Sequence, residues 1–177
     1  MFMLLLCVAT LLACSPEATL NETLDQSLLK ANLQSNSETK AVPRPFKMTI
    51  LDGTWSLSPG DGVSCSALVL QAMGEGNATH MGLTNVVEEW CWNGSPDDLG
   101  TRSLMLIAAN GDMVWGAQTM VIWNSPTSFE EVLEIQGGTG RFEHATGELR
   151  EYVETAAGDE TGTFGTFTFR AEGTITY

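Results

Sequence analysis

Basic residues are scarce in this chain. Its 177 residues include 8 lysines and arginines against 22 aspartates and glutamates, a formal net charge of −14 at pH 7. Nucleic-acid binders need a basic surface to neutralise phosphates, and anionic lipid surfaces likewise attract basic segments. The composition therefore argues against both kinds of partner and is typical of a soluble, self-repelling surface. The alternative, recruitment of a metal cation, requires clustered oxygen ligands.

Recognisable catalytic and metal-binding motifs are also missing. The two histidines are His80 and His144, and no spacing around them supplies the three or four close ligands of a zinc site. We expect His80 to hydrogen-bond the backbone and His144 to lie on the surface. No Ser/His/Asp pattern or phosphate-binding loop is present. The sequence thus predicts no metal and no cofactor, and it identifies no catalytic residue.

No hydrophobic run is long enough to span a bilayer. The apolar stretch MFMLLLCVATLLACS has the length of a signal peptide, although no lysine or arginine precedes it. Leu11-Leu12-Ala13-Cys14 resembles the lipobox of bacterial lipoproteins, in which the cysteine is lipidated and becomes the first mature residue. This resemblance implies a signal peptide over residues 1–13, a membrane anchor on Cys14, and a place in the bacterial cell envelope, either facing the periplasm or at the outer membrane.

The segment after this cysteine has the composition of a tether. Residues 14–45 are rich in Ser, Asn, Glu and Thr, contain no aromatic residue, and end in Pro-Arg-Pro. Leu20, Leu24 and Leu28 stand at helical spacing, so a short amphipathic helix is the alternative. We expect a flexible tether that holds the domain over residues 46–177 away from the membrane.

The remaining residues predict an all-β domain. In TFTFRAEGTITY, apolar and polar residues alternate strictly, as in a half-buried antiparallel strand. Asn110-Gly111 stands between two apolar segments and is a strong hairpin signal. Eight strands in about 130 residues favour a single closed, up-and-down antiparallel β-barrel, which removes exposed sheet edges; an open sandwich is the alternative. The strands are expected over residues 46–58, 63–74, 79–92, 102–109, 112–123, 128–136, 147–155 and 163–176.

The stretch GGTGRFEHATGE, residues 137–148, predicts a corner in this barrel. Its glycines, Gly137, Gly138 and Gly140, allow positive φ where a strand ends and the chain turns back. We expect two apolar residues of the stretch to plug the barrel end, and the last glycine to lead into the next strand. The residues assigned to this structural corner are Gly138, Gly140, Phe142, Ala145 and Gly147.

Two motifs resemble those of a known superfamily. GGTGRFEHATGE resembles the Gly-Thr-Gly-Arg-Phe-x-x-Ala-x-Gly signature of the allene oxide cyclase and dirigent barrels, and GEGNATHMGLT, residues 74–84, resembles a stretch of its uncharacterised bacterial members. The resemblance implies a calycin-like, eight-stranded barrel with a central apolar cavity, and often a trimer. Cyclases of this group fold an unsaturated epoxide into a ring in that cavity, and dirigent proteins steer radical coupling there. Only the glycine scaffolding matches, so no catalytic residue carries over.

Two cysteines remain in the domain, Cys65 and Cys91. A hairpin turning near Gly76-Asn77 would bring them nearly opposite one another on neighbouring strands, and an exported protein meets conditions in which disulfides persist. We predict a Cys65–Cys91 disulfide; two buried thiols are the alternative.

Acidic pairs offer a few candidate chemical groups. Neighbouring residues on a strand point to opposite faces, so one of Glu88 and Glu89 could face the barrel interior, where burial would favour acid–base chemistry. The commoner outcome is a glutamate in water. Asp97 and Asp98, in SPDDLGT, are interpreted as turn residues, with calcium binding as the alternative.

Tryptophan and methionine are frequent on the expected strands. In MVWGAQTMVIW, both faces are largely apolar, and Trp115 and Trp123 are expected to share one of them. The second apolar face needs cover, which favours a homo-oligomer, a trimer or dimer. Residues expected to line a cavity are Trp55, Glu88, Trp90, Trp115, Phe167 and Phe169.

Three functions are compatible with these observations. The favoured one is a lipid-anchored barrel that binds a small apolar molecule without catalysis, since cavities of small barrels commonly hold ligands. The second is a cyclase or isomerase that folds its substrate in the cavity. The third is a structural or interaction protein whose barrel is filled by its own side chains. The first two predict a real cavity, and the third predicts Trp, Phe and Met inside it.

Overall fold

The computed structural model describes residues 41–92 and 102–177. The predicted signal peptide, the lipidated Cys14, the tether up to residue 40, and the turn containing Asp97 and Asp98 lie outside the described residues. The barrel begins at Arg44, so the last two residues of the predicted tether belong to the first strand. No helix in the described part of the chain is long and apolar enough to cross a membrane.

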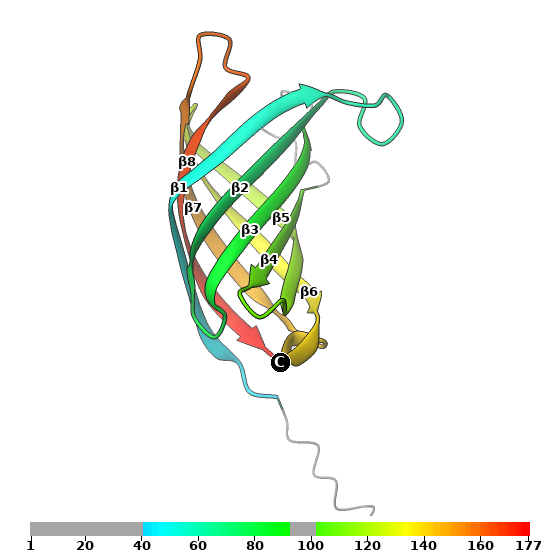
Figure 1. Ribbon diagram of the computed structural model, residues 1–177, viewed down its shortest axis with the longest axis vertical. Helices are drawn as coiled ribbons and strands as arrows, with labels where there is room; N and C mark the ends of the chain where they lie inside the picture. The colour runs from blue at the N-terminus through cyan, green and yellow to red at the C-terminus, as the bar shows by residue number, and fades with distance from the viewer. Residues whose placement is uncertain (1–40, 93–101) are drawn as a thin grey trace, which may run out of the picture. The chain divides into compact units, whose positions relative to one another are not determined.

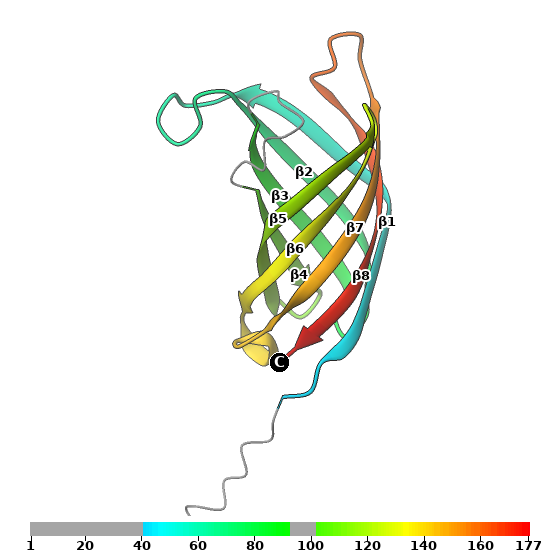
Figure 2. The same ribbon diagram turned by 180° about the vertical axis from the view of Figure 1, so that it is seen from behind.

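Eight antiparallel strands close into one barrel, in sequence order around the ring (Figures 1 and 2). This confirms the predicted all-β, up-and-down fold and rules out the open sandwich for the described residues. The strands are β1 (Arg44–Pro59), β2 (Leu68–Ala78), β3 (Gly82–Trp92), β4 (Ser103–Ala108), β5 (Met113–Ser125), β6 (Ser128–Gly138), β7 (Thr146–Ala157) and β8 (Phe164–Thr176).

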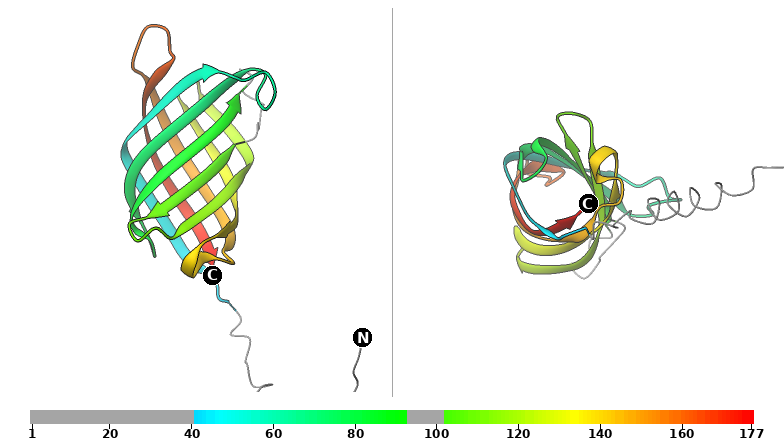
Figure 3. Two further views of the ribbon diagram at one scale, coloured as in Figure 1. Left: turned by 45° about the vertical axis from the view of Figure 1, so that its right-hand side comes forward. Right: turned by 90° about the horizontal axis from the view of Figure 1, so that it is seen from below.

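Alternation of apolar and polar residues builds the barrel wall. Along β8, Phe167, Phe169, Ala171 and Ile175 are buried, while the intervening residues are exposed or half-buried. β8 pairs with β1 and β7 along nearly its whole length, which closes the ring. Viewed from below, the strands surround a common axis (Figure 3). The inward faces of all eight strands therefore share one interior.

The two ends of the barrel differ in their connections. One end, here the corner end, carries the β2–β3 and β4–β5 turns, the short 3-10 helix η1 (Gly140–Phe142) and the C-terminus (Figure 1). The other end, here the cavity end, carries the β1–β2 loop and the β5–β6 and β7–β8 turns. The β4–β5 turn is the predicted Asn110-Gly111 hairpin, with Gly111 at φ 86°.

The glycine-rich stretch forms the predicted corner. Phe142 and Ala145 are 0% and 1% exposed, so they close this end of the interior, and Phe142 packs edge-on against Tyr177. Gly140 has φ 58°, and a Cβ there would collide with the Asp112 carboxylate; Gly147 has φ 151°. Positive φ at Gly137 and Gly138 was a wrong expectation. Both end β6, and Gly138 is required because a Cβ would collide with the main chain at Met113 and Phe142.

The disulfide between Cys65 and Cys91 is confirmed, with the Cα atoms 5.5 Å apart. The hairpin that supports it differs from the expectation, since it turns at residues 79–81 instead of Gly76-Asn77, and Cys65 lies in the β1–β2 loop before β2 begins. His80 takes φ 69° in this turn and its Nε2 lies 3.0 Å from the Pro45 carbonyl oxygen, as expected for a backbone hydrogen bond.

A bulge in β5 places Trp115 and Trp123, which were predicted to share one face of the strand, on opposite faces. Gln118 pairs with Leu133 and Met120 with Val132, so Thr119 is an extra residue in β5. An extra residue shifts the alternation by one and moves the following side chains to the opposite face. Trp123 therefore points into the interior, whereas Trp115, before the bulge, is 38% exposed on the outside. The prediction that Trp115 lines the cavity was wrong.

Candidate functional site

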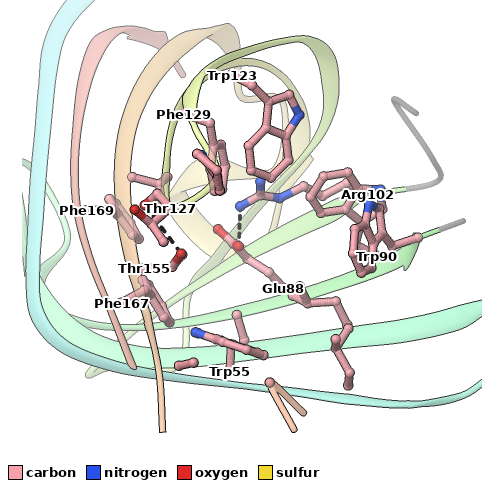
Figure 4. Close-up of a pocket in the computed structure, with 18 of the residues that line it drawn as sticks. Trp55, Glu88, Trp90, Arg102, Trp123, Thr127, Phe129, Thr155, Phe167 and Phe169 are labelled. Carbon is pink, nitrogen blue, oxygen red and sulfur yellow. Dashed lines mark hydrogen bonds and ion pairs between the residues drawn. The ribbon is translucent and has the colours of Figure 1, made fainter. Parts of the chain in front are cut away.

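A cavity of about 480 Å³ occupies the cavity end of the barrel. Its walls are mainly aromatic and aliphatic, and the β5–β6 and β7–β8 turns contribute to its rim (Figure 4). A volume of this size is typical of small-molecule sites. The inward side chains that form the wall include Trp55, Leu70, Ala72, Glu88, Trp90, Trp92, Arg102, Trp123, Phe129, Val153, Phe167 and Phe169.

A layer of charged side chains forms the floor of this cavity. Arg102, directly before β4, bonds through one guanidinium nitrogen to Glu88 of β3 and through the other to Glu131 of β6. Its Nη2 also lies 3.9 Å from Oε2 of Glu151, on β7. The Gln118 side-chain amide donates to Glu131 Oε2 at 2.6 Å. Each of the four charged residues is at most 5% exposed, so this charged layer is a buried ion network inside the barrel.

The layer divides the interior into two parts. On each of the three strands, the residue two positions from the glutamate toward the corner end is buried and aliphatic. These residues are Val86, Leu133 and Leu149. The residue two positions from the glutamate toward the cavity end lines the cavity. These residues are Trp90, Phe129 and Val153. The period-two geometry of strands thus stacks an aliphatic core, a charged layer and a cavity wall along the barrel axis.

Burial gives two of these carboxyl groups unusual proton affinities. Desolvation raises the pKa of Glu131 to about 7, against the opposing attraction of Arg102. Desolvation, followed by repulsion from Glu88 and Glu131, raises the pKa of Glu151 well above its ordinary value. Glu131 and Glu151 stand directly opposite each other on β6 and β7, so the two carboxyl groups lie close enough to repel each other when both are charged. One cation cannot offset three buried negative charges, so at least one of these carboxyls keeps its proton near neutral pH.

Some buried polar atoms of the site lack a partner among the described residues. These include Glu88 Oε1 and the indole nitrogens of Trp90, Trp92 and Trp123. By contrast, the Trp55 indole donates to the Thr166 carbonyl at 3.1 Å. Buried polar groups in proteins nearly always have hydrogen-bond partners. The unpartnered atoms therefore give an otherwise apolar cavity several points at which a molecule could form hydrogen bonds.

Two aspartates order the loops at the cavity end. Asp61 Oδ1 accepts backbone N–H groups of Val63, Ser64 and Cys65 at 2.7–3.0 Å, and these bonds lower its pKa to about 2. In the β7–β8 turn, hydrogen bonds lower the pKa of Asp159, and the bond donated by the Thr161 side chain has the largest effect. These contacts, together with the disulfide, hold the loops in place by local bonds and a covalent link.

The structure places most of the sequence-predicted cavity residues in the wall. Trp55, Glu88, Trp90, Phe167 and Phe169 line the cavity. Glu89, next to Glu88, is exposed, as strand geometry requires. Sequence reasoning selected Glu88 but missed the three other members of the charged layer.

Two of the three missed residues carried a usable signal. Glu131 alternates with Phe129 and Leu133, and Glu151 alternates with Leu149 and Val153. An acid at an otherwise apolar position of a strand is a candidate buried charge. Arg102 carried no such signal, because it stands at the edge of a strand beside a turn-rich segment.

The histidines do not form a metal centre. His144 is exposed at the corner, and no group of three or more His, Cys, Asp and Glu side chains within residues 41–92 and 102–177 could hold a metal ion. In the charged layer, Arg102 occupies the position between the carboxylates that a cation would otherwise take.

Comparisons with known proteins add little to this description. No family model matches the sequence, and no curated protein matches it. Among solved structures, the chain is similar to a pterocarpan synthase dirigent protein, with 15% sequence identity and a TM-score of 0.42, over 78% of this chain and 86% of that one. At this level of similarity, we draw no conclusion from it about this chain.

Proposed function

We propose that this protein binds a small, largely apolar molecule in the cavity at one end of its barrel, without transforming it. The observation that carries the proposal is the unequal filling of the interior. Aliphatic and aromatic side chains occupy the corner end, while a cavity of about 480 Å³ with aromatic walls remains beyond the charged layer. This volume argues against a barrel filled by its own side chains.

The wall composition supports an apolar ligand. Four tryptophans, three phenylalanines and six aliphatic residues line the cavity, against five polar or charged residues. Burial of apolar ligand surface against this wall is favourable by about 25 cal/mol per Å². Three methionines on the strands do not line this cavity. Met73, Met105 and Met120 are 58%, 39% and 40% exposed on the outside of the barrel.

Native mass spectrometry of the full-length protein, purified from its own host, tests this function. We expect a bound mass of a few hundred daltons, by the size of ligands that such cavities hold. The variant Ala72→Trp, which fills the cavity from β2, should lose that mass, while Gln71→Trp, outward on the same strand, should retain it. Absence of any bound mass, with no uptake from a host lipid extract, would contradict the proposal.

A cyclase or isomerase is the second candidate, and the buried carboxyl groups favour it. Glu88 lines the cavity, and Glu131, with a pKa raised to about 7, is linked to it through Arg102. Groups that exchange protons near neutral pH suit acid–base catalysis. Incubation of the purified protein with the molecule it retains separates the two candidates, because an enzyme would convert the molecule and a binding protein would return it unchanged.

The family and the location are part of the same proposal. Assignment to the allene oxide cyclase and dirigent superfamily is supported by the motif GGTGRFEHATGE, which forms a barrel corner in this chain. The Leu11-Leu12-Ala13-Cys14 motif supports a lipid anchor in a bacterial cell envelope. Labelling with a radioactive or alkyne-bearing fatty acid tests the anchor, and Cys14→Ser should abolish incorporation.

Self-association is the last element of the proposal. Cross-strand pairing aligns Met73, Val87, Met105 and Trp115 in one row across the outside of β2 to β5. Met73, Met105 and Trp115 are exposed, and an apolar row of this kind favours contact with a second copy. Light scattering should give a mass above that of one chain, and Met105→Glu should reduce it to that of one chain. A monomeric wild type would contradict this element alone.

A further inference from the structure

We infer that the cavity selects molecules that carry a positively charged amine or quaternary ammonium group on an apolar body. This inference rests on the proposed binding function and narrows the class of ligand. It follows from two independent features of the cavity, its aromatic wall and the charge of its floor.

Aromatic rings surround the cavity on several sides. Trp123 and Phe129 lie on one side of the Glu88–Arg102 pair, and Trp55 lies on the other (Figure 4). Faces of aromatic rings attract cations within about 6 Å, tryptophan most strongly, and cages of such rings bind quaternary ammonium groups. The Trp90 ring already shows this preference, since the guanidinium carbon of Arg102 lies 5.6 Å from its centroid.

The floor adds a carboxylate with a free oxygen. Glu88 is 4% exposed and lines the cavity. Its Oε2 bonds to Arg102, whereas its Oε1 is buried and has no partner among the described residues. A buried carboxylate oxygen without a partner is costly, and an ammonium N–H or the positive methyl groups of a quaternary ammonium would offset that cost.

The charge of the whole layer disfavours an anion. Arg102 contributes one positive charge, and its two terminal nitrogens are engaged by Glu88 and Glu131 with Glu151 nearby. At least one of the three surrounding carboxyl groups keeps its proton, and the others are paired with Arg102, so the layer offers the cavity no unpaired positive charge. A carboxylate ligand would have to compete with Glu88 and Glu131 for the terminal nitrogens of Arg102.

Three probes with the same chain and different head groups test the inference. Octyltrimethylammonium, 1-octanol and octanoate share an apolar tail and differ in charge. Titration calorimetry of each into the full-length protein should show affinity in the order cation, alcohol, anion. A desolvated cation–π contact together with an ion pair predicts a preference of about tenfold or more for the cation over the alcohol.

Two variants identify the groups responsible. Glu88→Gln removes the carboxylate charge and should abolish most of the preference for the cation, while Glu89→Gln, the exposed neighbour on the same strand, should leave it unchanged. Trp123→Leu keeps an apolar wall without touching the charged layer and should reduce the preference severalfold. Because Trp123→Leu leaves the ion network intact, it tests the inference even if Glu88→Gln fails to fold.

The outcomes separate this inference from the proposed function. Equal affinity for cation and alcohol, or tighter binding of octanoate, would overturn the cation preference while the binding function stands. Binding of none of the three probes would overturn both. A preference for the cation that survives both Glu88→Gln and Trp123→Leu would show that a different surface of this acidic protein binds it, and would overturn the assignment to the cavity.

Discussion

The two ends of this barrel use the same strands for different purposes. At the corner end, inward positions carry closely packed side chains such as Phe46, Leu133, Leu149 and Ile175, each at most 1% exposed. At the cavity end, inward positions of β1, β6 and β8 carry large rings that surround empty volume. A packed interior stabilises the fold, whereas an unfilled interior has fewer packing contacts but leaves room for a small molecule to bind.

The charged layer marks the boundary between these ends. Toward the corner end, apolar burial holds the strands together. Toward the cavity end, the disulfide and the backbone N–H groups that donate to the Asp61 and Asp159 carboxylates hold the loops. We therefore expect substitutions at the corner end to act on stability and substitutions at the cavity end to act on binding. Four predictions test this division, from the largest expected effect to the smallest.

Arg102→Leu should have the largest effect, because it leaves three buried carboxyl groups without their cation. We expect a loss of about 3–5 kcal/mol in the free energy of unfolding, measured by chemical denaturation. Arg150→Leu is the control, since Arg150 forms a 3.2 Å pair with Glu130 on the barrel surface and should cost under about 1 kcal/mol. Similar costs for the two variants would contradict the role of the charged layer.

Leu133→Ala, in the filled half, should cost about 3 kcal/mol, because it creates a cavity in a tightly packed core. Leu70→Ala makes the same chemical change at a half-buried position in the cavity wall and should cost about 1 kcal/mol or less. Thermal or denaturant unfolding compares the two. Equal losses would mean that the two halves of the interior are equally packed in solution.

Removal of the disulfide should act on one end only. Replacing both Cys65 and Cys91 by serine should cost about 3 kcal/mol, as expected for a bridge across 26 residues. Hydrogen exchange should then increase around the β1–β2 loop and the end of β3, with little change at the corner formed by η1. Uniform loss of protection along the strands would argue against independent stabilisation of the two ends.

The smallest expected effect is a dependence of stability on pH. Burial raises the pKa of Glu131 to about 7, so between about pH 5 and pH 7 the folded state keeps a proton that the unfolded state has lost. Stability should therefore fall as the pH rises through this range, and Glu151, whose pKa is also raised, should add to the fall.

Glu131→Gln should make the fall between about pH 5 and pH 7 shallower, because the amide does not titrate there and the contribution of Glu151 remains. Glu134→Gln, which removes an exposed carboxyl from the same strand, should leave the slope as in the wild type. Unfolding free energies measured at intervals of one pH unit compare the three proteins. A wild-type stability that rises over this range would contradict the raised pKa of Glu131.

Strand alternation explains how much of the site could be predicted. Phe167 and Phe169 were assigned to the interior from period two alone, and Glu88 followed because only one of two neighbouring residues can face inward. The same rule failed for Trp115, since a single extra residue in β5 reversed the faces and nothing local in the sequence marks Thr119 as that residue.

Local patterns thus determined the eight strands and the corner at Gly140, and they indicated the Cys65–Cys91 disulfide although the predicted turn between the two strands was misplaced. Such features depend on neighbours along the chain or on the adjacent strand. The ion network depends on closure of the ring, which brings Glu88, Arg102, Glu131 and Glu151 together from four separate parts of the sequence. Only the tertiary structure decided where side chains fill the barrel and where they leave a cavity, because that depends on how residues from all eight strands pack across one shared interior.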